Sequence, residues 1–201
     1  QVVKNTIPAL AEAMESVREK MIVFKYQLGY ILTGKRRLTK SLDAMKPELE
    51  RYTRIAGQIK EKSKERNALL SEKKATPMLN ILKHRDLSRR IAELTEELEE
   101  LRSEKKQLLA MLDYAEDTGL ATVKKDVSAM EANLVKLEQQ EQKYTAELDA
   151  ALVEYNELKA QAANFDPDEL AMAQLEIRPQ KEASAESKIQ AAYGEKFETS
   201  T

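Results

Sequence analysis

The sequence predicts an all-α protein in which long helices form an elongated antiparallel coiled-coil hairpin, with a further long helix beside it. The main observation is that apolar residues recur in alternating steps of three and four along most of the 201 residues. This is the spacing of the seam that a coiled-coil helix buries against a partner. The composition agrees, because Ala, Leu, Glu, Lys and Arg supply 110 residues while Gly and Pro supply only five each, as expected for long helices with few turns.

The first predicted element is a long basic helix within residues 1–75, which we expect to begin near Asn5–Ile7. Pro47 lies inside it, and an internal proline costs about 3 kcal/mol because it removes a backbone hydrogen bond. We expect either a kink near Pro47 or a break after which Pro47 occupies the first turn of a new helix. The residue before a proline avoids helical angles, so Thr76-Pro77 should end the helix.

A connector over residues 76–85 leads to a predicted antiparallel helical hairpin over residues 86–165. Asp86 is a good N-cap for its first helix. The turn between its two helices should lie at Asp117-Thr118-Gly119, with Gly119 in a left-handed C-terminal conformation. Such a short turn makes the helices antiparallel. The expected seam pairs are Leu112 with Val123, Leu108 with Val127, Leu101 with Leu134, Leu98 with Leu137 and Leu87 with Leu148.

Beyond Leu148 the second hairpin helix is longer than the first, so its apolar stripe needs another partner. The residues concerned are Ala151, Tyr155, Leu158 and Ala162. The helix at the start of the same chain is one candidate partner, and a second protomer is the other.

The last predicted element, residues 166–201, is a short capped helix followed by a mobile tail. Asp166 is placed to cap it, Pro167 suits the first helical position, and Glu169 completes a capping box. We expect this helix to end before Pro179, with at most one or two further turns between Ala183 and Tyr193. Polarity rises here and the apolar spacing is lost, which is typical of a mobile end.

Charge is divided unevenly along the chain. Residues 1–85 carry 19 Lys+Arg against 9 Asp+Glu, whereas residues 86–201 carry 14 against 26. One interpretation is a basic arm that contacts phosphate. The other is that basic and acidic helices of the chain lie side by side and pair their flanking charges. Charge alone leaves both interpretations open.

Two basic clusters are candidate contacts for a nucleic-acid backbone. Lysine and arginine neutralise phosphates without reading bases, and the chain contains no recognisable base-reading module. The alternative is that these residues only keep the flanks of a coiled coil in solution. The candidates are Lys35, Arg36, Arg37 and Lys40 in the first cluster, and Lys83, Arg85, Arg89 and Arg90 in the second.

No catalytic, cofactor or metal site is expected. A seam of this kind builds rods rather than pockets, and His84 is the only histidine, so no histidine pair or triad can form. Gly29, Gly34 and Lys35 fit part of a phosphate-binding P-loop, but Arg36 stands where Ser or Thr should hold magnesium, and a helical stripe replaces the strand that should precede the loop. We therefore expect no cofactor, no small-molecule substrate and no enzymatic activity.

Localisation is predicted to be cytoplasmic. The chain has no cysteine, which fits a reducing compartment. It has no signal peptide and no apolar run near the ~20 residues that cross a bilayer, so no membrane partner is expected. The expected partners are a DNA backbone through the basic N-terminal half, and a protein partner or a second copy through the helical seam.

Several stretches resemble a known family in the order of their residues as well as in the spacing of their apolar residues. They are Met14–Lys20, Lys83–Leu94, Met111–Gly119, Ala163–Pro167, Ile177–Pro179 and Gln190–Lys196. They resemble the helical region downstream of the nuclease domain in MobA/MobL-type mobilisation relaxases, and the resemblance covers nearly the whole chain.

Relaxases of this family nick plasmid or transposon DNA with a tyrosine nucleophile and a histidine-bound metal. This chain contains no such catalytic site. The resemblance therefore implies a non-catalytic coiled-coil module of a DNA-mobilisation protein, which acts as a scaffold and in partner or nonspecific DNA contact. A full-length parent would be the DNA-nicking relaxase. The alternative is a generic structural spacer or oligomerisation module with no DNA role.

Overall fold

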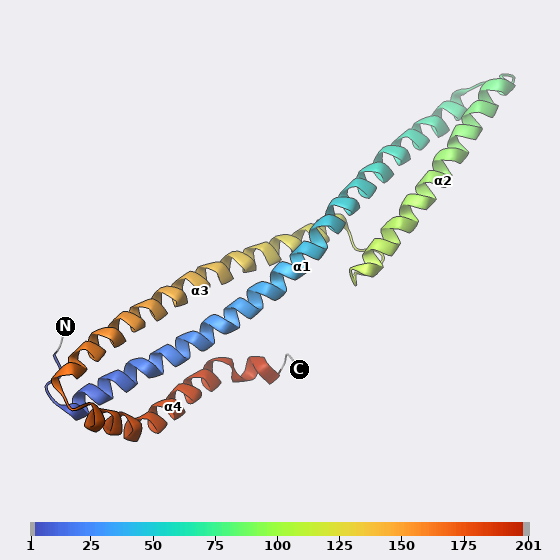
Figure 1. Cartoon of the computed structure of the whole chain (residues 1–201). Coiled ribbons are helices and arrows are strands. Elements are labelled where there is room, and N and C mark those ends of the chain that lie inside the picture. Colours follow the sequence, from blue (N-terminus) through green and yellow to red (C-terminus); the bar gives the residue numbers. More distant parts are fainter. Residues whose placement is uncertain (1–2, 199–201) are drawn as a thin grey trace. The chain divides into compact units, whose positions relative to one another are not determined.

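The protein is all-α, as the sequence predicts. The computed structural model describes residues 3–198, in which four α-helices and one 3-10 turn follow one another and no strand occurs. The elements are α1 (Ile7–Ala75), α2 (Ile81–Met111), α3 (Leu120–Gln161), the turn Ala162–Asn164 and α4 (Pro167–Glu198) (Figure 1). In this described part, no helix is both long and apolar enough to span a membrane.

The helices form two compact units. One unit contains the described residues up to Arg37 and those from Leu134 onward, and the other contains residues 38–133. We call the first the three-helix unit, because it holds the first half of α1, most of α3 and all of α4. We call the second the hairpin unit, because it holds the second half of α1, all of α2 and only the start of α3.

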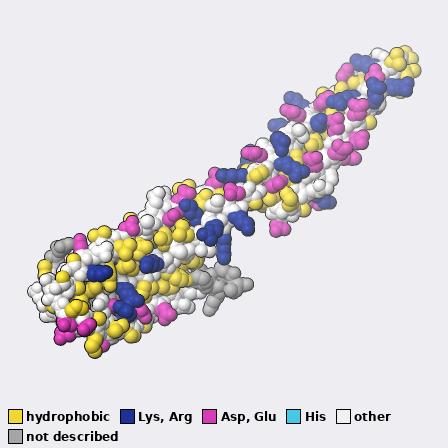
Figure 2. All heavy atoms as spheres, in the orientation of Figure 1, with side chains coloured by type: hydrophobic (Ala, Val, Ile, Leu, Met, Phe, Trp, Pro, Cys, Tyr) yellow, Lys and Arg dark blue, Asp and Glu magenta, His cyan; other side chains and the backbone are white. Residues whose placement is uncertain are grey.

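In the hairpin unit, α1 and α2 lie antiparallel. Three ion pairs show this direction, because the residue number increases on α1 while it decreases on α2. The pairs are Lys62–Glu97, Glu65–Arg90 and Glu72–Lys83. Figure 2 shows charged side chains of both signs along this hairpin. Pro77 ends α1 as predicted, but α2 begins earlier than expected. Asn80, not Asp86, is the N-cap, and its side-chain oxygen accepts a hydrogen bond from the Lys83 backbone N–H at 3.3 Å.

The core of the hairpin unit joins α1 and α2 to the start of α3. Its buried members are Tyr52, Ile55, Leu108, Leu109 and Val123. The buried Tyr52 hydroxyl donates a hydrogen bond to the Thr118 carbonyl at 2.8 Å, so the link between α2 and α3 is tied to α1.

That link corrects the expectation for Gly119. The left-handed residue that ends α2 is Asp113, with φ 60°, and no glycine among the described residues has a positive φ. The Tyr114 N–H donates to the Leu109 carbonyl at 2.8 Å and the Asp113 N–H to Ala110 at 3.1 Å, which is the Schellman arrangement. Aspartate tolerates this conformation better than most residues. Gly119 instead directly precedes α3, and its carbonyl accepts from the Thr122 N–H at 3.1 Å.

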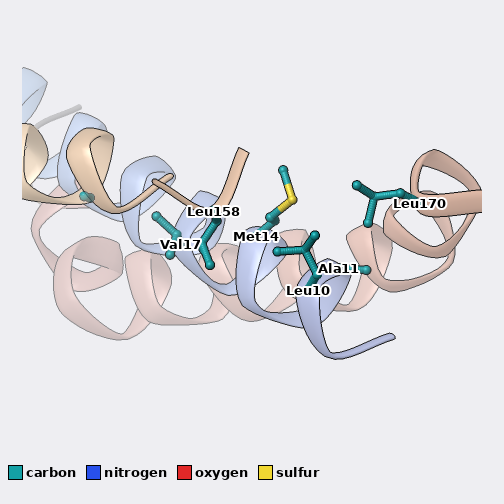
Figure 3. Close-up of a cluster of buried hydrophobic side chains, with 7 residues drawn as sticks. Leu10, Ala11, Met14, Val17, Leu158 and Leu170 are labelled. Atoms are coloured by element: carbon teal, nitrogen blue, oxygen red, sulfur yellow. The ribbon is translucent and has the colours of Figure 1, made fainter. Parts of the chain in front are cut away.

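In the three-helix unit, α3 lies antiparallel to α1 and α4 lies parallel to it. The ion pairs Lys20–Glu154 and Lys35–Glu141 join α1 to α3. Pairs with rising numbers on both helices, Glu12–Lys181 and Glu19–Lys188, join α1 to α4. The core between the three helices is drawn in Figure 3, and its buried members are Leu10, Ala11, Met14, Val17, Ala151, Leu158 and Leu170.

The predicted seam between residues 86–112 and 121–148 is present at its turn end, where Leu108, Leu112 and Val123 belong to one core, but most of each stripe packs elsewhere. Antiparallel pairs do form, but α1 is the partner of both α2 and α3, and Leu87 and Leu148 belong to different compact units. At about 1.5 Å per residue the 69 residues of α1 extend about 100 Å, so α1 offers enough seam for both helices in turn. The open question about the end of α3 is also answered, because Ala151 and Leu158 pack against the start of α1 in the same chain.

Two internal prolines do not interrupt their helices. α1 continues through Pro47 as well as Gly29 and Gly34, so the predicted restart at Pro47 is wrong. α4 begins as predicted, with Asp166 Oδ1 accepting from the backbone N–H groups of Asp168 and Glu169 at 3.0 Å, but it then continues through Pro179.

The continuity of α4 has a tertiary cause. Arg178 and Lys181, on either side of Pro179, are paired with Glu15 and Glu12 of α1. These pairs hold both sides of the proline against α1 and help to offset its cost. The expected break before Pro179 is therefore wrong, and Ala183–Tyr193 belongs to the same helix. The rest of the predicted mobile tail reaches residues 199–201, which lie outside the described residues.

Candidate nucleic-acid interface

The first predicted basic cluster lies on α1, and its members differ in their surroundings. Lys35 donates a hydrogen bond from Nζ to Glu141 Oε2 at 2.8 Å, and this bond raises the pKa of Lys35. Arg36 and Arg37 are exposed, and neither forms an ion pair with a residue of the described part of the chain. Two free guanidinium groups therefore stand beside one lysine that is already neutralised.

Lys40, the fourth member, belongs to the hairpin unit. It lies one helical turn beyond Arg36 on α1, is exposed and, within residues 3–198, forms no ion pair. Its charge is thus also available to a ligand.

The second predicted cluster lies at the start of α2, and most of its charge is used within the protein. Arg90 donates to Glu65 Oε1 at 3.1 Å and lies 3.4 Å from Glu93, and the hydrogen bond to Glu65 raises the pKa of Arg90. Lys83 is paired with Glu72, and Arg89 with Asp86. Arg85 alone is exposed without an ion pair to any described residue. This cluster is a weaker candidate than the first.

The residues that resemble part of a P-loop form no phosphate-binding loop. Residues 29–35 lie inside α1, so their backbone N–H groups are not gathered around a ligand. An open groove of about 510 Å³ does run beside Lys35, but three carboxylates line it, those of Glu138, Glu141 and Asp149. A phosphate would be repelled there.

Two titratable side chains outside the basic clusters, those of His84 and Tyr114, are engaged in structural contacts. His84 Nε2 lies 3.0 Å from the Thr76 carbonyl oxygen. Burial raises the pKa of Tyr114 to about 12, helped by its hydrogen bond to Asp126 at 2.6 Å. A tyrosine with a raised pKa is harder to ionise and so a weaker nucleophile. In residues 3–198, no group of three or more His, Cys, Asp or Glu side chains is placed to hold a metal ion.

Sequence reasoning missed the most enclosed polar site, a carboxylate network between α1 and α4. Glu15 is only 1% exposed and accepts hydrogen bonds from Arg178 Nη2 at 3.0 Å and Gln174 Nε2 at 3.4 Å. Glu19 accepts from Ser184 Oγ at 2.6 Å and Lys188 Nζ at 2.7 Å.

Burial opposes ionisation of Glu19, but its two hydrogen bonds and the positive charges of Lys188 and Lys181 together outweigh burial and lower its pKa below the ordinary value. A signal for the network exists in the sequence. Acidic residues recur at positions 12, 15 and 19 of a basic helix, and basic residues recur at 178, 181 and 188.

Comparison with known proteins gives no relative. No protein-family model matches the chain, and neither the curated proteins nor the solved structures contain a significant match.

Proposed function

We propose that the chain is a non-catalytic helical scaffold module of a DNA-mobilisation protein, and that it contacts the DNA backbone without sequence preference. The observation that carries the DNA contact is the pair of exposed arginines, Arg36 and Arg37, whose charges no described acidic residue neutralises. The link to mobilisation depends on the resemblance of the sequence to the helical region of MobA/MobL-type relaxases.

The expected contact is narrow. Arginine binds phosphate through a rigid fork of donors, and two adjacent arginines on one helix can each reach a phosphate. Glu138 and Glu141 flank Lys35 and would repel DNA, so the contact should be limited to the α1 surface that carries Arg36 and Arg37. Lys40 offers one further contact if the DNA follows α1.

Salt dependence of DNA binding tests the proposal. Two or three phosphate contacts should make the affinity for duplex DNA fall roughly 10- to 40-fold between 50 and 200 mM salt. The double variant Arg36→Glu/Arg37→Glu should weaken binding by about tenfold or more at low salt and reduce the salt slope by about two. Fluorescence anisotropy with two unrelated duplexes measures both effects and should give the same affinity for each.

Lys124→Glu/Lys125→Glu is the matched control. These lysines are also adjacent and exposed on a helix, and the charge change is the same. If the control loses as much affinity as the arginine variant, the contact is only an effect of net charge and the proposed surface is wrong.

A structural spacer without a DNA role is the alternative, and one observation favours a monomeric spacer over an oligomerisation module. The apolar stripe at the end of α3, which could have joined a second protomer, is covered by α1 and α4 of the same chain. Absence of DNA binding even at low salt would select the spacer. Light scattering after size exclusion then distinguishes a monomeric spacer from an oligomerisation module.

A further inference from the structure

The end of the α1–α2 hairpin is covered by exposed apolar side chains. Met78 is 87% exposed, Leu79 94%, Ile81 72% and Leu82 75%. Figure 2 shows hydrophobic side chains gathered at this end of the hairpin, next to Lys and Arg side chains. Connecting turns are normally polar, and a contiguous exposed apolar patch marks a contact with another protein or a membrane. We call these four residues the apolar tip.

In the turn that carries the apolar tip, several polar groups are paired internally. The Asn80 N–H donates to the Pro77 carbonyl at 3.0 Å, and the Thr76 hydroxyl donates to the Glu72 carbonyl at 2.8 Å. The Asn80 side chain caps α2, and the His84 ring contacts the Thr76 carbonyl. Burying a polar group is costly only when it lacks a hydrogen bond, so these internal bonds lower the cost of moving the turn into an apolar medium.

The tip is surrounded by positive charge. Residues 70–90 contain six Lys and Arg against two Asp and Glu. Both acidic residues are already paired, Glu72 with Lys83 and Asp86 with Arg89. Lys73, Lys74 and Arg85 have no ion pair within the described chain. The occupant should therefore be anionic, and a tip-to-tip contact between two copies would place like charges together.

The directions of the four apolar side chains point to the kind of occupant. Ile81 and Leu82 are successive residues at the start of a helix and so diverge by about 100°, and Met78 and Leu79 are successive residues of the turn. All four are at least 72% exposed, so the rest of the hairpin leaves them uncovered, and a contact with both Ile81 and Leu82 must reach around the tip. A protein would need a socket around the whole tip, whereas hydrocarbon surrounds it on all sides without any matching shape.

We propose that the apolar tip inserts into the surface of an anionic lipid bilayer, with Met78, Leu79, Ile81 and Leu82 below the headgroups and Lys73, Lys74 and Arg85 at the lipid phosphates. Apolar side chains flanked by Lys and Arg are the usual chemistry of such surface contacts. The expectation of no membrane partner rested on the lack of a run that crosses a bilayer, and a surface contact does not need one. This inference does not depend on the proposed DNA contact.

Flotation with lipid vesicles tests the inference. The chain should bind vesicles of phosphatidylcholine mixed with phosphatidylserine, and bind pure phosphatidylcholine vesicles much more weakly. Leu79→Ser/Ile81→Ser should reduce binding by at least about tenfold. Lys73→Gln/Lys74→Gln should reduce it about fivefold per lysine on the anionic vesicles only. Circular dichroism checks that the variants remain helical.

Met172→Ser/Leu175→Ser is the matched control, because these residues are also exposed, at 65% and 59%, but lie on α4. It should bind vesicles like the unchanged protein. The chain has no tryptophan, so Leu79→Trp adds a single fluorescent reporter whose emission should shift to shorter wavelength on the anionic vesicles.

Three results would overturn the inference. They are no binding of the unchanged protein to the anionic vesicles, an equal loss in the α4 control, or no shift in the emission of the Leu79→Trp variant. After the first or the third result, the remaining candidate occupant would be a protein with a socket that encloses the tip. DNA binding of Leu79→Ser/Ile81→Ser should be unchanged, so failure of this inference and failure of the proposed DNA contact are distinguishable.

Discussion

In the three-helix unit, α4 covers one flank of α1 and two carboxylates are buried there, Glu15 at 1% and Glu19 at 7% exposure. In the hairpin unit, the flanks of the α1–α2 seam stay open, and no Asp or Glu is buried among its described residues. A two-helix seam leaves the flanking charges in water, whereas a third helix encloses some of them. The comparison teaches that similar ion pairs should contribute unequally to stability in the two units.

The largest expected loss of stability comes from substitutions in the two cores, and it serves as the reference against which the ion-pair effects in each unit are compared. Leu10→Ala in the three-helix unit and Leu108→Ala in the hairpin unit each remove a side chain that is at most 1% exposed. Each should lower the free energy of unfolding by about 2–5 kcal/mol through lost burial and a residual cavity. Urea unfolding followed by circular dichroism measures both. A loss of stability in only one unit would show that the cores are not equivalent, and ion-pair effects in the two units could then not be compared directly.

Breaking the Glu15–Arg178 pair should have the next largest effect. Arg178→Met keeps most of the side-chain volume but leaves a buried carboxylate with only Gln174 at 3.4 Å and Arg18 at 3.7 Å. We expect a loss of about 2 kcal/mol in the free energy of unfolding, because an unsatisfied buried charge is costly.

A double variant separates the two contributions to this loss of stability, the lost packing and the unpaired buried charge. Glu15→Leu/Arg178→Met removes both charges and should recover most of the stability, since apolar replacements of buried ion pairs are often neutral or better. If the double variant is as unstable as Arg178→Met alone, the buried charge is not the cause, and this half of the comparison is wrong.

The fold class and several helix ends were predictable because their causes are local. Pro77 ends α1 and Asp166-Pro167 starts α4 as the sequence indicates. The partner of each helix was not predictable, because spacing shows only that a stripe is buried. The apolar stripes of α1, α2 and α3 have the same period. From spacing alone, Leu98 could therefore pack against Leu137 as well as either could pack against α1.

The candidate site shows the same limit. Exposed charges such as Arg36 and Arg37 can be found from sequence, but whether a neighbouring cation such as Lys35 is neutralised depends on Glu141 of another helix. Gly119 was expected to be left-handed because of its residue type, whereas the hydrogen bonds at the end of α2 place Asp113 there. Pro179 ends no helix because tertiary pairs on both sides outweigh a local penalty.

A smaller effect should come from Glu19 and depend on pH. Hydrogen bonds from Lys188 and Ser184 lower its pKa below the ordinary 4.5, so its contribution to stability is fully present above that value and is lost as the pH falls through the lower folded-state pKa. Glu19→Gln should therefore cost about 1 kcal/mol near neutral pH, and the difference from the unchanged protein should vanish in acid. Urea unfolding at a series of pH values measures it. A difference that persists in acid would mean that Glu19 acts through packing and not through its charge.

The smallest effect is expected where distance alone would suggest a strong interaction. Lys62 Nζ lies 2.6 Å from Glu97 Oε2 in the hairpin unit, but the two side chains are 32% and 40% exposed. Water and salt screen exposed pairs, and ordering two long side chains costs entropy. Lys62→Ala should leave the melting temperature unchanged within error at physiological salt, although the carboxylate pKa of Glu97, which the hydrogen bond from Lys62 lowers, should return toward its ordinary value in NMR titration. A loss of stability as large as that of Arg178→Met would show that contact distance, and not enclosure by a third helix, sets the strength of ion pairs in both units.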